Sequence, residues 1–288
     1  MKKLASLLLT LVMIMTMGLC ASAETVVELP RNETLYFAGQ QWGTVNSWNV
    51  IGTNQNNAMA IAGNAGGYRT LMFETLYMFD FMDGSLRPLL ADGDYAWNET
   101  MTELTVKIKD AAKWSDGAPL TAEDVKATLE IGVQIGNTTG NDYGAYISAI
   151  EPVDEKTLVI KAALREDGMA VNPLRVLDFL TGAPIAQKAW IDAVVARNNG
   201  DAVAILNDAG EDVVWSGPYT KLYADDQKVV LVRDDNYWGQ DASMWGRLPV
   251  PKYIGHAIYA DNPAGENALK NGEVDVCQLF IGNVQKLW

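Results

Sequence analysis

Histidine and cysteine are scarce in this chain of 288 residues, which contains one histidine and two cysteines. Serine and cysteine nucleophiles usually need a histidine as their base, so such chemistry would depend on His256 alone, and no Gly-x-Ser-x-Gly elbow accompanies it. A zinc site would need an uncommon majority of carboxylate ligands. We therefore predict no catalytic residue, no metal and no cofactor, and we expect a structural histidine beside Tyr253 and Tyr259.

Basic residues are also few. The chain has 22 lysines and arginines against 36 aspartates and glutamates, which gives a formal net charge of -14. A nucleic-acid binder needs clustered cations to replace the counterions of the phosphates, and the sequence shows no such cluster. Nucleic acid is therefore excluded as a partner, and we interpret the acidity as a contribution to solubility. The many carboxylates leave a glycosidase pair open, so a secreted hydrolase stays as a remote alternative.

Long hydrophobic runs are absent except near the amino terminus. Two lysines at positions 2 and 3 precede an apolar stretch over residues 7–19, which is too short to span a bilayer comfortably. Residues 21–23 read Ala-Ser-Ala, the form of a signal-peptidase site. We predict a signal peptide over residues 1–23 and export to the periplasm or to the outside of the cell.

Cys20 leaves a second possibility open, because a cysteine at this place could be lipid-modified and anchor the exported chain. The bulky Leu19 before it is unusual for a lipoprotein signal, so we favour plain cleavage with Glu24 as the new amino terminus. In that case Cys277 is the only cysteine left, and no intramolecular disulfide can form.

The most informative stretch is residues 113–125, which read Lys-Trp-Ser-Asp-Gly-Ala-Pro-Leu-Thr-Ala-Glu-Asp-Val. Apolar and polar residues alternate over 104–109 before it, which predicts a half-buried strand. Ser-Asp-Gly then forms a turn, and Thr121 and Asp124 have the spacing of a capping box. We expect a helix from position 122 to about 131.

Strand, tryptophan, Ser-Asp-Gly-x-Pro-Leu-Thr-Ala-Glu-Asp-Val and helix in this order resemble the signature of the family 5 extracellular solute-binding proteins. These receptors feed ABC importers with oligopeptides, dipeptides, nickel or oligosaccharides. Two later stretches agree in order. The first runs from Trp215 to Tyr219 and leads into the strand 229–233 and Asn-Tyr-Trp-Gly at 236–239, and the second reads Ala-Leu-Lys-Asn-Gly-Glu-Val-Asp-Val at 268–276. The resemblance implies an α/β fold, namely a periplasmic-binding-protein type II-like lobe with an inserted α+β subdomain, whose second lobe is missing from this sequence.

The resemblance also implies a domain organisation. We expect a discontinuous first lobe made of residues 24–72 and 206–282. The inserted subdomain is expected over residues 73–205, and residues 283–288 would begin the missing second lobe. Such a single lobe would offer one wall of a ligand site, so we expect this chain to bind weakly by itself.

Candidate binding residues lie in the polar loop over residues 40–57, which has no helical or strand period. It combines flat aromatic faces with amide donors and acceptors, a mixture that suits a sugar and also a peptide backbone. We predict ligand contacts for Trp42, Asn46, Trp48 and Asn49. The alternative for either tryptophan is that it fills the joint with the subdomain.

Two further ligand-binding residues are implied by the resemblance alone. Tyr143 occupies the place after the signature helix where peptide-binding members often present a tyrosine to the ligand. Gln278 lies on the expected crossing strand between the lobes. The signature itself we interpret as scaffold, because Trp114, Gly117 and Thr121 all have complete structural explanations.

The function implied by the resemblance is that of an extracytoplasmic receptor which captures oligopeptides and delivers them to an ABC permease in the membrane. Short stretches at 35–43 and 74–80 look closest to the branch that binds cello-oligosaccharides, so an oligosaccharide ligand is the alternative. We expect a monomeric binding protein and not an enzyme.

Overall fold

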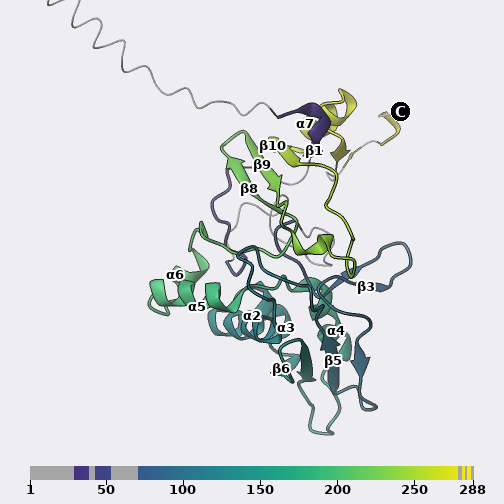
Figure 1. Ribbon diagram of the computed structural model, residues 1–288, viewed down its shortest axis with the longest axis vertical. Coiled ribbons are helices and arrows are strands. Elements are labelled where there is room, and N and C mark those ends of the chain that lie inside the picture. Colours follow the sequence, from purple (N-terminus) through teal and green to yellow (C-terminus); the bar gives the residue numbers. More distant parts are fainter. Residues whose placement is uncertain (1–28, 39–42, 53–70, 278–280, 283, 287–288) are drawn as a thin grey trace, which may run out of the picture. The chain divides into compact units, whose positions relative to one another are not determined.

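The computed structural model describes residues 29–38, 43–52, 71–277, 281–282 and 284–286. The chain divides into two compact units, Met1–Asn32 and Glu33–Trp288. Apart from η1 (Arg31–Glu33), a short 3-10 helix that straddles this boundary, every described element belongs to the second unit. Figure 1 shows these elements coloured along the sequence.

The elements of the second unit are mostly short. The strands are β1 (Thr34–Ala38), β2 (Tyr77–Phe79), β3 (Leu86–Pro88), β4 (Ala96–Trp97), β5 (Glu103–Lys107), β6 (Ile147–Pro152), β7 (Thr157–Ala162), β8 (Tyr219–Ala224), β9 (Lys228–Arg233), β10 (Tyr253–Ala257) and β11 (Val276–Cys277). The helices are α2 (Ala122–Ile135), α3 (Thr138–Tyr143), α4 (Pro173–Gly182), α5 (Lys188–Arg197), α6 (Ala202–Leu206) and α7 (Asn262–Lys270), with 3-10 helices η2 (Trp238–Gln240) and η3 (Val284–Lys286).

A five-stranded sheet joins the beginning of the unit to its end. Its strand order is β11-β1-β10-β9-β8. β1 pairs in parallel with both β10 and β11, whereas β10, β9 and β8 pair antiparallel. All five strands come from residues 34–38 and 219–277, and the other two sheets lie between these segments in the sequence. The exact boundary of the first lobe stays a prediction.

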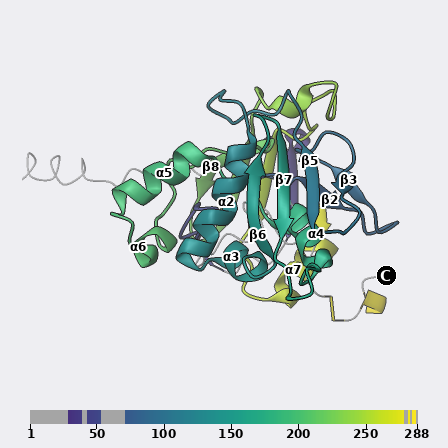
Figure 2. The same cartoon turned by 90° about the horizontal axis from the view of Figure 1, so that it is seen from below.

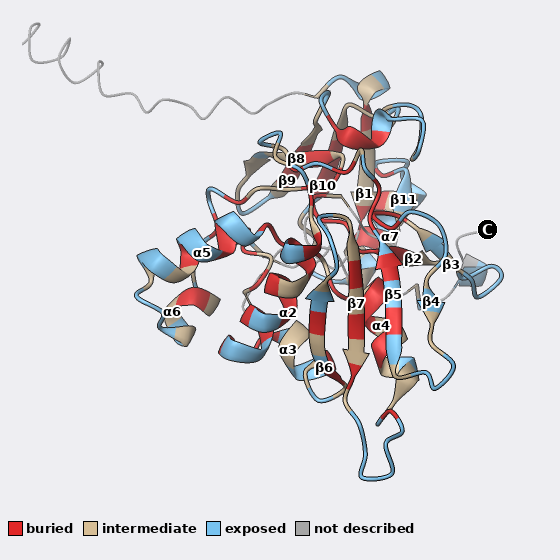
Figure 3. Cartoon of the chain, turned by 60° about the horizontal axis from the view of Figure 1, so that its bottom comes forward, coloured by how far each residue is buried: buried red, intermediate tan, exposed pale blue. Residues whose placement is uncertain are grey.

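A four-stranded antiparallel sheet forms the second part of the unit, in the order β4-β5-β7-β6. β5 shows the predicted alternation, because Leu104 and Val106 are buried between exposed neighbours. Figure 3 shows this alternation of red and pale blue along the strand. Helix α2 packs beside β6, as the view from below in Figure 2 shows, and α4 contacts β7.

Helix α2 begins at the predicted Ala122 but extends four residues beyond the predicted end. It continues because Ile131 and Ile135 are buried, so the apolar face lasts one more turn than the capping pattern indicated. Gly136 then ends the helix with a φ of 68°, a left-handed conformation that glycine adopts without steric cost.

Two hydrophobic clusters meet at α2. Val125 and Leu129 pack into the cluster of the four-stranded sheet, whereas Ile131 and Ile135 pack into the cluster of the five-stranded sheet. Helix α5 also contributes to the latter cluster, so it packs with the five-stranded sheet although it precedes residue 206. Helix α2 therefore packs against both parts of the unit.

Within the described ranges, no helix is both long enough and apolar enough to cross a bilayer.

Candidate functional site

The loop after β1 holds three of the predicted ligand residues within the described structure. Asn46 is exposed, whereas Trp48 is 7% exposed and Asn49 is fully buried. The loop is fastened to the segment after α6, because Ser47 Oγ donates a hydrogen bond to the carbonyl of Asp208 (2.9 Å) and Trp48 N donates to the carbonyl of Ala209 (2.7 Å). These contacts join parts of the chain that are about 160 residues apart.

Asn49 has its amide occupied within the lobe. Its Nδ2 donates to the carbonyl of Ile205 (2.8 Å), and its Oδ1 accepts from the backbone of Ile51 (2.9 Å). Gly210 lies so close that a Cβ there would be 2.5 Å from Asn49 N, and its φ of 62° also requires glycine. The side chain therefore braces the loop and presents no exposed face to a ligand.

Trp48 packs into the cluster of the five-stranded sheet, with the ammonium of Lys221 5.4 Å from the centre of its ring. This placement corresponds to the alternative in which the tryptophan fills a joint. Trp42 and Gln278 lie outside the described residues, so their contacts with a ligand stay predictions. Asn46 is the exposed one among the predicted residues that the structure describes.

Tyr143 lies at the end of α3 and is 4% exposed. Its ring meets Phe179 edge to face at 5.4 Å between centroids, and the Arg175 guanidinium lies 5.2 Å from the centre of the same ring. Its hydroxyl rests against Gly182, where a Cβ would clash at 1.9 Å. Burial raises the pKa of this hydroxyl above its usual value. Such enclosure between α3 and α4 argues against the ligand contact that the resemblance implied.

The buried side chains of the signature stretch hold its turn together. Trp114 is 3% exposed, and its Nε1 donates to Oδ2 of the buried Asp124 (3.2 Å). The same carboxylate accepts from the backbone of Thr121 (2.8 Å), which is one half of the predicted capping box, and from the backbone of Lys188 (2.7 Å). The Thr121 hydroxyl also donates to Asp124 (3.0 Å). The carboxylate of Asp124 therefore holds this turn together through its hydrogen bonds.

The signature also meets the second family-like stretch in space. Ser115 N donates to the carbonyl of Trp215 (2.8 Å), and Trp215 N donates back to Ser115 Oγ (3.2 Å). Across the turn, Gln187 Nε2 donates to Asp116 Oδ2 (2.8 Å). Two sequence stretches that are 100 residues apart thus form one rigid joint.

Glu74 has a buried carboxyl that the sequence patterns did not predict, and the residue is 1% exposed. The Tyr237 hydroxyl donates to one of its oxygens, and Trp238 Nε1 donates to the other (2.9 Å). Burial raises the pKa of Glu74 to about 8, although these two donors and the charge of Lys109 act in the opposite direction. The pattern around residue 74 carries no signal for this contact, since its partners lie 163 and 164 residues away.

Metal ligation finds no support in the geometry, because among the described residues no three histidine, cysteine, aspartate or glutamate side chains are grouped suitably for an ion.

The architecture defines the class of protein as a lobe of the periplasmic-binding-protein type II fold. The crystal structure of a periplasmic oligopeptide-binding protein from Thermotoga maritima, with mannohexaose bound, matches 90% of this chain and 44% of that protein, with a TM-score of 0.71 and 27% identity. The oligopeptide-binding protein AppA of Bacillus subtilis, in complex with a nonapeptide, matches with a TM-score of 0.64 at 16% identity over 85% of this chain and 44% of that one, which shows the fold alone.

The profile of the bacterial extracellular solute-binding proteins, family 5, matches residues 85–288, and the chain belongs to this family. A relative from Brucella ovis, described as an ABC transporter peptide-binding protein, is 27% identical over 258 residues. That match covers 84% of this chain and 43% of the relative, so the chain spans less than half the length of the curated relatives it matches. The family resemblance and the fold class are thereby confirmed.

Proposed function

We propose that this chain forms the first lobe of an extracytoplasmic solute-binding receptor, which captures oligopeptides and delivers them to an ABC permease. The observation that carries the proposal is the family match over residues 85–288. It is supported by the Brucella ovis relative, which is described as a peptide-binding protein of an ABC transporter. The protein binds its ligand and releases it unchanged, so we assign it no catalytic residue.

The fold suits a receptor that closes on its ligand. A two-lobed receptor moves as two rigid bodies about a hinge, and a ligand favours the closed form by its difference in affinity for the two states. Hydrogen bonds of Ser115 with Trp215 and of Glu74 with Ser216 tie the segments around Ser115 and Glu74 to the segment that leads into β8. The lobe can therefore move as one body when a second lobe closes on it.

For the ligand site we propose the loop after β1. Asn46 is exposed there, and Trp42 and Gln278 complete the proposed contacts. Trp48, Asn49 and Tyr143 are buried, so we propose that they act indirectly by holding this loop and the subdomain in place. Export would follow from the signal peptide proposed for residues 1–23, and we propose that the exported protein is monomeric.

An oligosaccharide is the second candidate ligand, and one observation favours it. The Thermotoga maritima protein, at 27% identity, is described as an oligopeptide-binding protein and yet has mannohexaose bound. Stacking on an indole and hydrogen bonds to amides would serve a sugar, and both groups occur in the proposed loop.

Calorimetry tests this proposal with two proteins: the chain itself, and the chain extended at its carboxyl end by the remaining segment of the Thermotoga maritima protein. We expect the extended protein to bind an oligopeptide or mannohexaose, and the chain alone to bind at least ten times more weakly. A folded extended protein that binds neither class of ligand would contradict the proposed function. Asn46→Ala should weaken binding to the extended protein, and Asn141→Ala, on the exposed side of α3, serves as the control.

A further inference from the structure

A cavity of about 730 Å³ opens beside the signature stretch, and none of the predicted ligand-binding residues lines it. Its lining comes from Asp92, from the segment 109–117 and from the segment 236–243 after β9. Sites for small molecules usually have volumes of about 300 to 1,000 Å³. The cavity therefore has the size of a ligand site and lies entirely within the described lobe.

Three aromatic side chains form the base of the cavity, and hydrogen bonds hold them in place. Trp114, Tyr237 and Trp238 line it and are at most 7% exposed. Their polar atoms point into the protein, because Trp114 donates to Asp124 and the other two donate to Glu74. They therefore present apolar surface to the cavity, and these buried hydrogen bonds hold them in place.

Gly239 allows the backbone of η2 to lie directly against the ring of Tyr237. A Cβ at this position would be 2.3 Å from the ring of Tyr237, which is closer than any side chain tolerates. Asp241 is fixed in the same segment, since its carboxylate accepts from the backbone (2.9 Å) and the hydroxyl (2.8 Å) of Ser243. The wall of the cavity is thus preformed, which lowers the entropic cost of binding.

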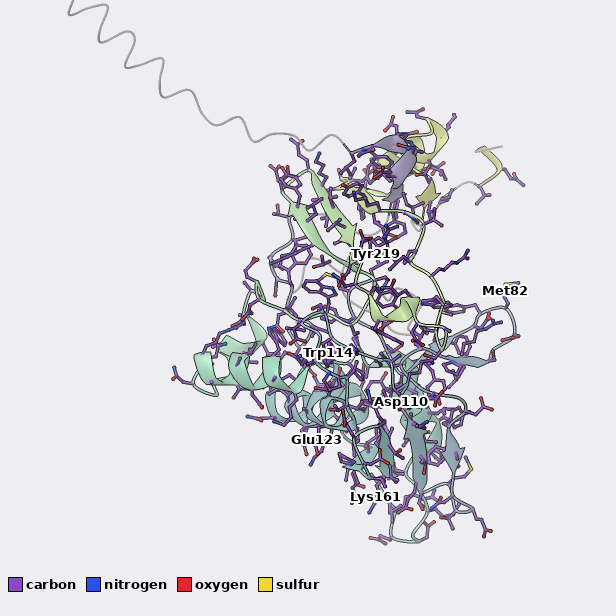
Figure 4. The ribbon with its side chains drawn as sticks, viewed as in Figure 1. Met82, Asp110, Trp114, Glu123, Lys161 and Tyr219 are labelled. Atoms are coloured by element: carbon purple, nitrogen blue, oxygen red, sulfur yellow. The ribbon has the colours of Figure 1, made fainter. Side chains whose placement is uncertain are left out.

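Charges of both signs line the cavity. Lys113 and Asp110 are exposed, and in the described part of the chain neither side chain has an ion pair or a hydrogen bond. Asp92 is partly neutralised by Lys107 at 2.8 Å. Figure 4 labels Asp110 and Trp114, which come from this same segment.

We propose that this cavity is a second binding site, for a small zwitterion of the size of an amino acid or a dipeptide. Lys113 would receive the carboxylate of the ligand, and Asp110 and Asp241 would receive its ammonium group. A ligand with only negative charge would be repelled by the aspartates, and one with only positive charge would leave Lys113 uncompensated. The proposal is independent of the proposed function, because it needs no second lobe.

Calorimetry on the purified chain tests the site with L-alanyl-L-alanine as the probe. N-acetylated dialanine carries only the negative charge, and dialanine amide carries only the positive charge. We expect dialanine to bind and each capped analogue to bind at least ten times more weakly. Equal binding of the three compounds, or no binding of dialanine, would overturn the proposal.

Matched variants locate the site. Lys113→Gln and Asp110→Asn should each weaken dialanine binding at least fivefold, whereas Lys126→Gln and Asp94→Asn, which remove charges outside the cavity, should leave it unchanged. All four positions are on the surface or near it, and circular dichroism verifies that the variants are folded. Binding that is lost in Asn46→Ala but kept in Lys113→Gln would place dialanine in the proposed loop and refute a site in the cavity.

Discussion

Glu74 connects segments of the lobe that are far apart in the sequence. Its backbone N donates to Ser216 Oγ (3.0 Å), and its carbonyl accepts from Ile185 N (3.0 Å). Its carboxyl binds Tyr237 and Trp238. Desolvation favours the neutral form of this buried carboxyl, so the free energy of unfolding depends on the protonation of Glu74.

Glu74 should make the chain less stable as the pH rises. The pKa of Glu74 is about 8 in the folded state against 4.5 as the reference value. Between these values the unfolded chain releases the proton and the folded chain keeps it, so the free energy of unfolding falls as the pH rises and levels off above about 8. Glu74→Gln mimics the neutral acid and should remove this pH dependence. The total change in the free energy of unfolding between the two pKa values is several kcal/mol at most.

Urea unfolding at a series of pH values between 5 and 9 measures that slope. Glu130→Gln, on the exposed side of α2, is the matched control and should leave the slope in place. An unchanged slope in Glu74→Gln would show that Glu74 is ionised throughout this range.

His256 should have the opposite effect at acidic pH. Burial lowers its pKa from 6.5 to about 4, and the side chain packs near Phe37 with ring centroids 5.6 Å apart. Below pH 6.5 the unfolded chain takes up a proton that the folded chain does not, so stability is lost as the pH falls towards 4. The loss is on the order of 3 kcal/mol.

Any loss of stability that is caused by protonation of a histidine must come from His256, because it is the only histidine in the sequence. His256→Gln should flatten the thermal stability of the chain between pH 6.5 and 4.5, as measured by calorimetric unfolding. A stability that falls equally in the wild type and in the variant would mean that carboxylates alone produce the loss.

Among the helices and strands, the local patterns in the sequence predicted those features that depend on interactions between neighbouring residues. The alternation around Leu104 and the capping pair Thr121 and Asp124 were sufficient for β5 and for the start of α2. The end of α2 was missed because Ile135 is buried by a distant cluster. The burial of Tyr143 between α3 and α4 and the contacts of Glu74 arise from tertiary packing, which no spacing within the sequence encodes.

The turn of the signature stretch should carry much of the stability of the subdomain. Trp114→Ala removes a buried indole and should cost about 3 to 5 kcal/mol. Trp245→Ala, at a position 53% exposed, is the matched control and should cost far less. Thr121→Ala should cost about 1 kcal/mol through loss of a helix cap. Chemical denaturation of the purified variants gives all three values, and a small loss for Trp114→Ala would show that the signature is not scaffold.

At the scale of the whole molecule, a stretch of 204 matched residues and a fold shared with solved receptors agree on one class of protein. Composition predicted no nucleic-acid partner and offered a single histidine for catalysis, but it could not choose a ligand. Ligand identity depends on a few contacts between loops, and those contacts are set by tertiary structure.

Export is testable on the whole molecule. Expressed with residues 1–23 in a bacterium, the protein should leave the cytoplasm and begin at Glu24, because the apolar stretch ends in Ala-Ser-Ala. Amino-terminal sequencing of the exported protein checks this. A lipid-modified terminus at Cys20 would instead favour the lipoprotein alternative.

In the proposed function, the protein binds a ligand without converting it. Equilibrium dialysis of the extended chain against labelled short peptides and labelled mannohexaose, followed by mass spectrometry of the recovered ligand, tests it most directly. We expect one class to be retained and recovered chemically intact, with peptides retained in preference to the sugar. Recovery of cleaved peptide or shortened sugar would contradict the receptor role and favour the secreted hydrolase.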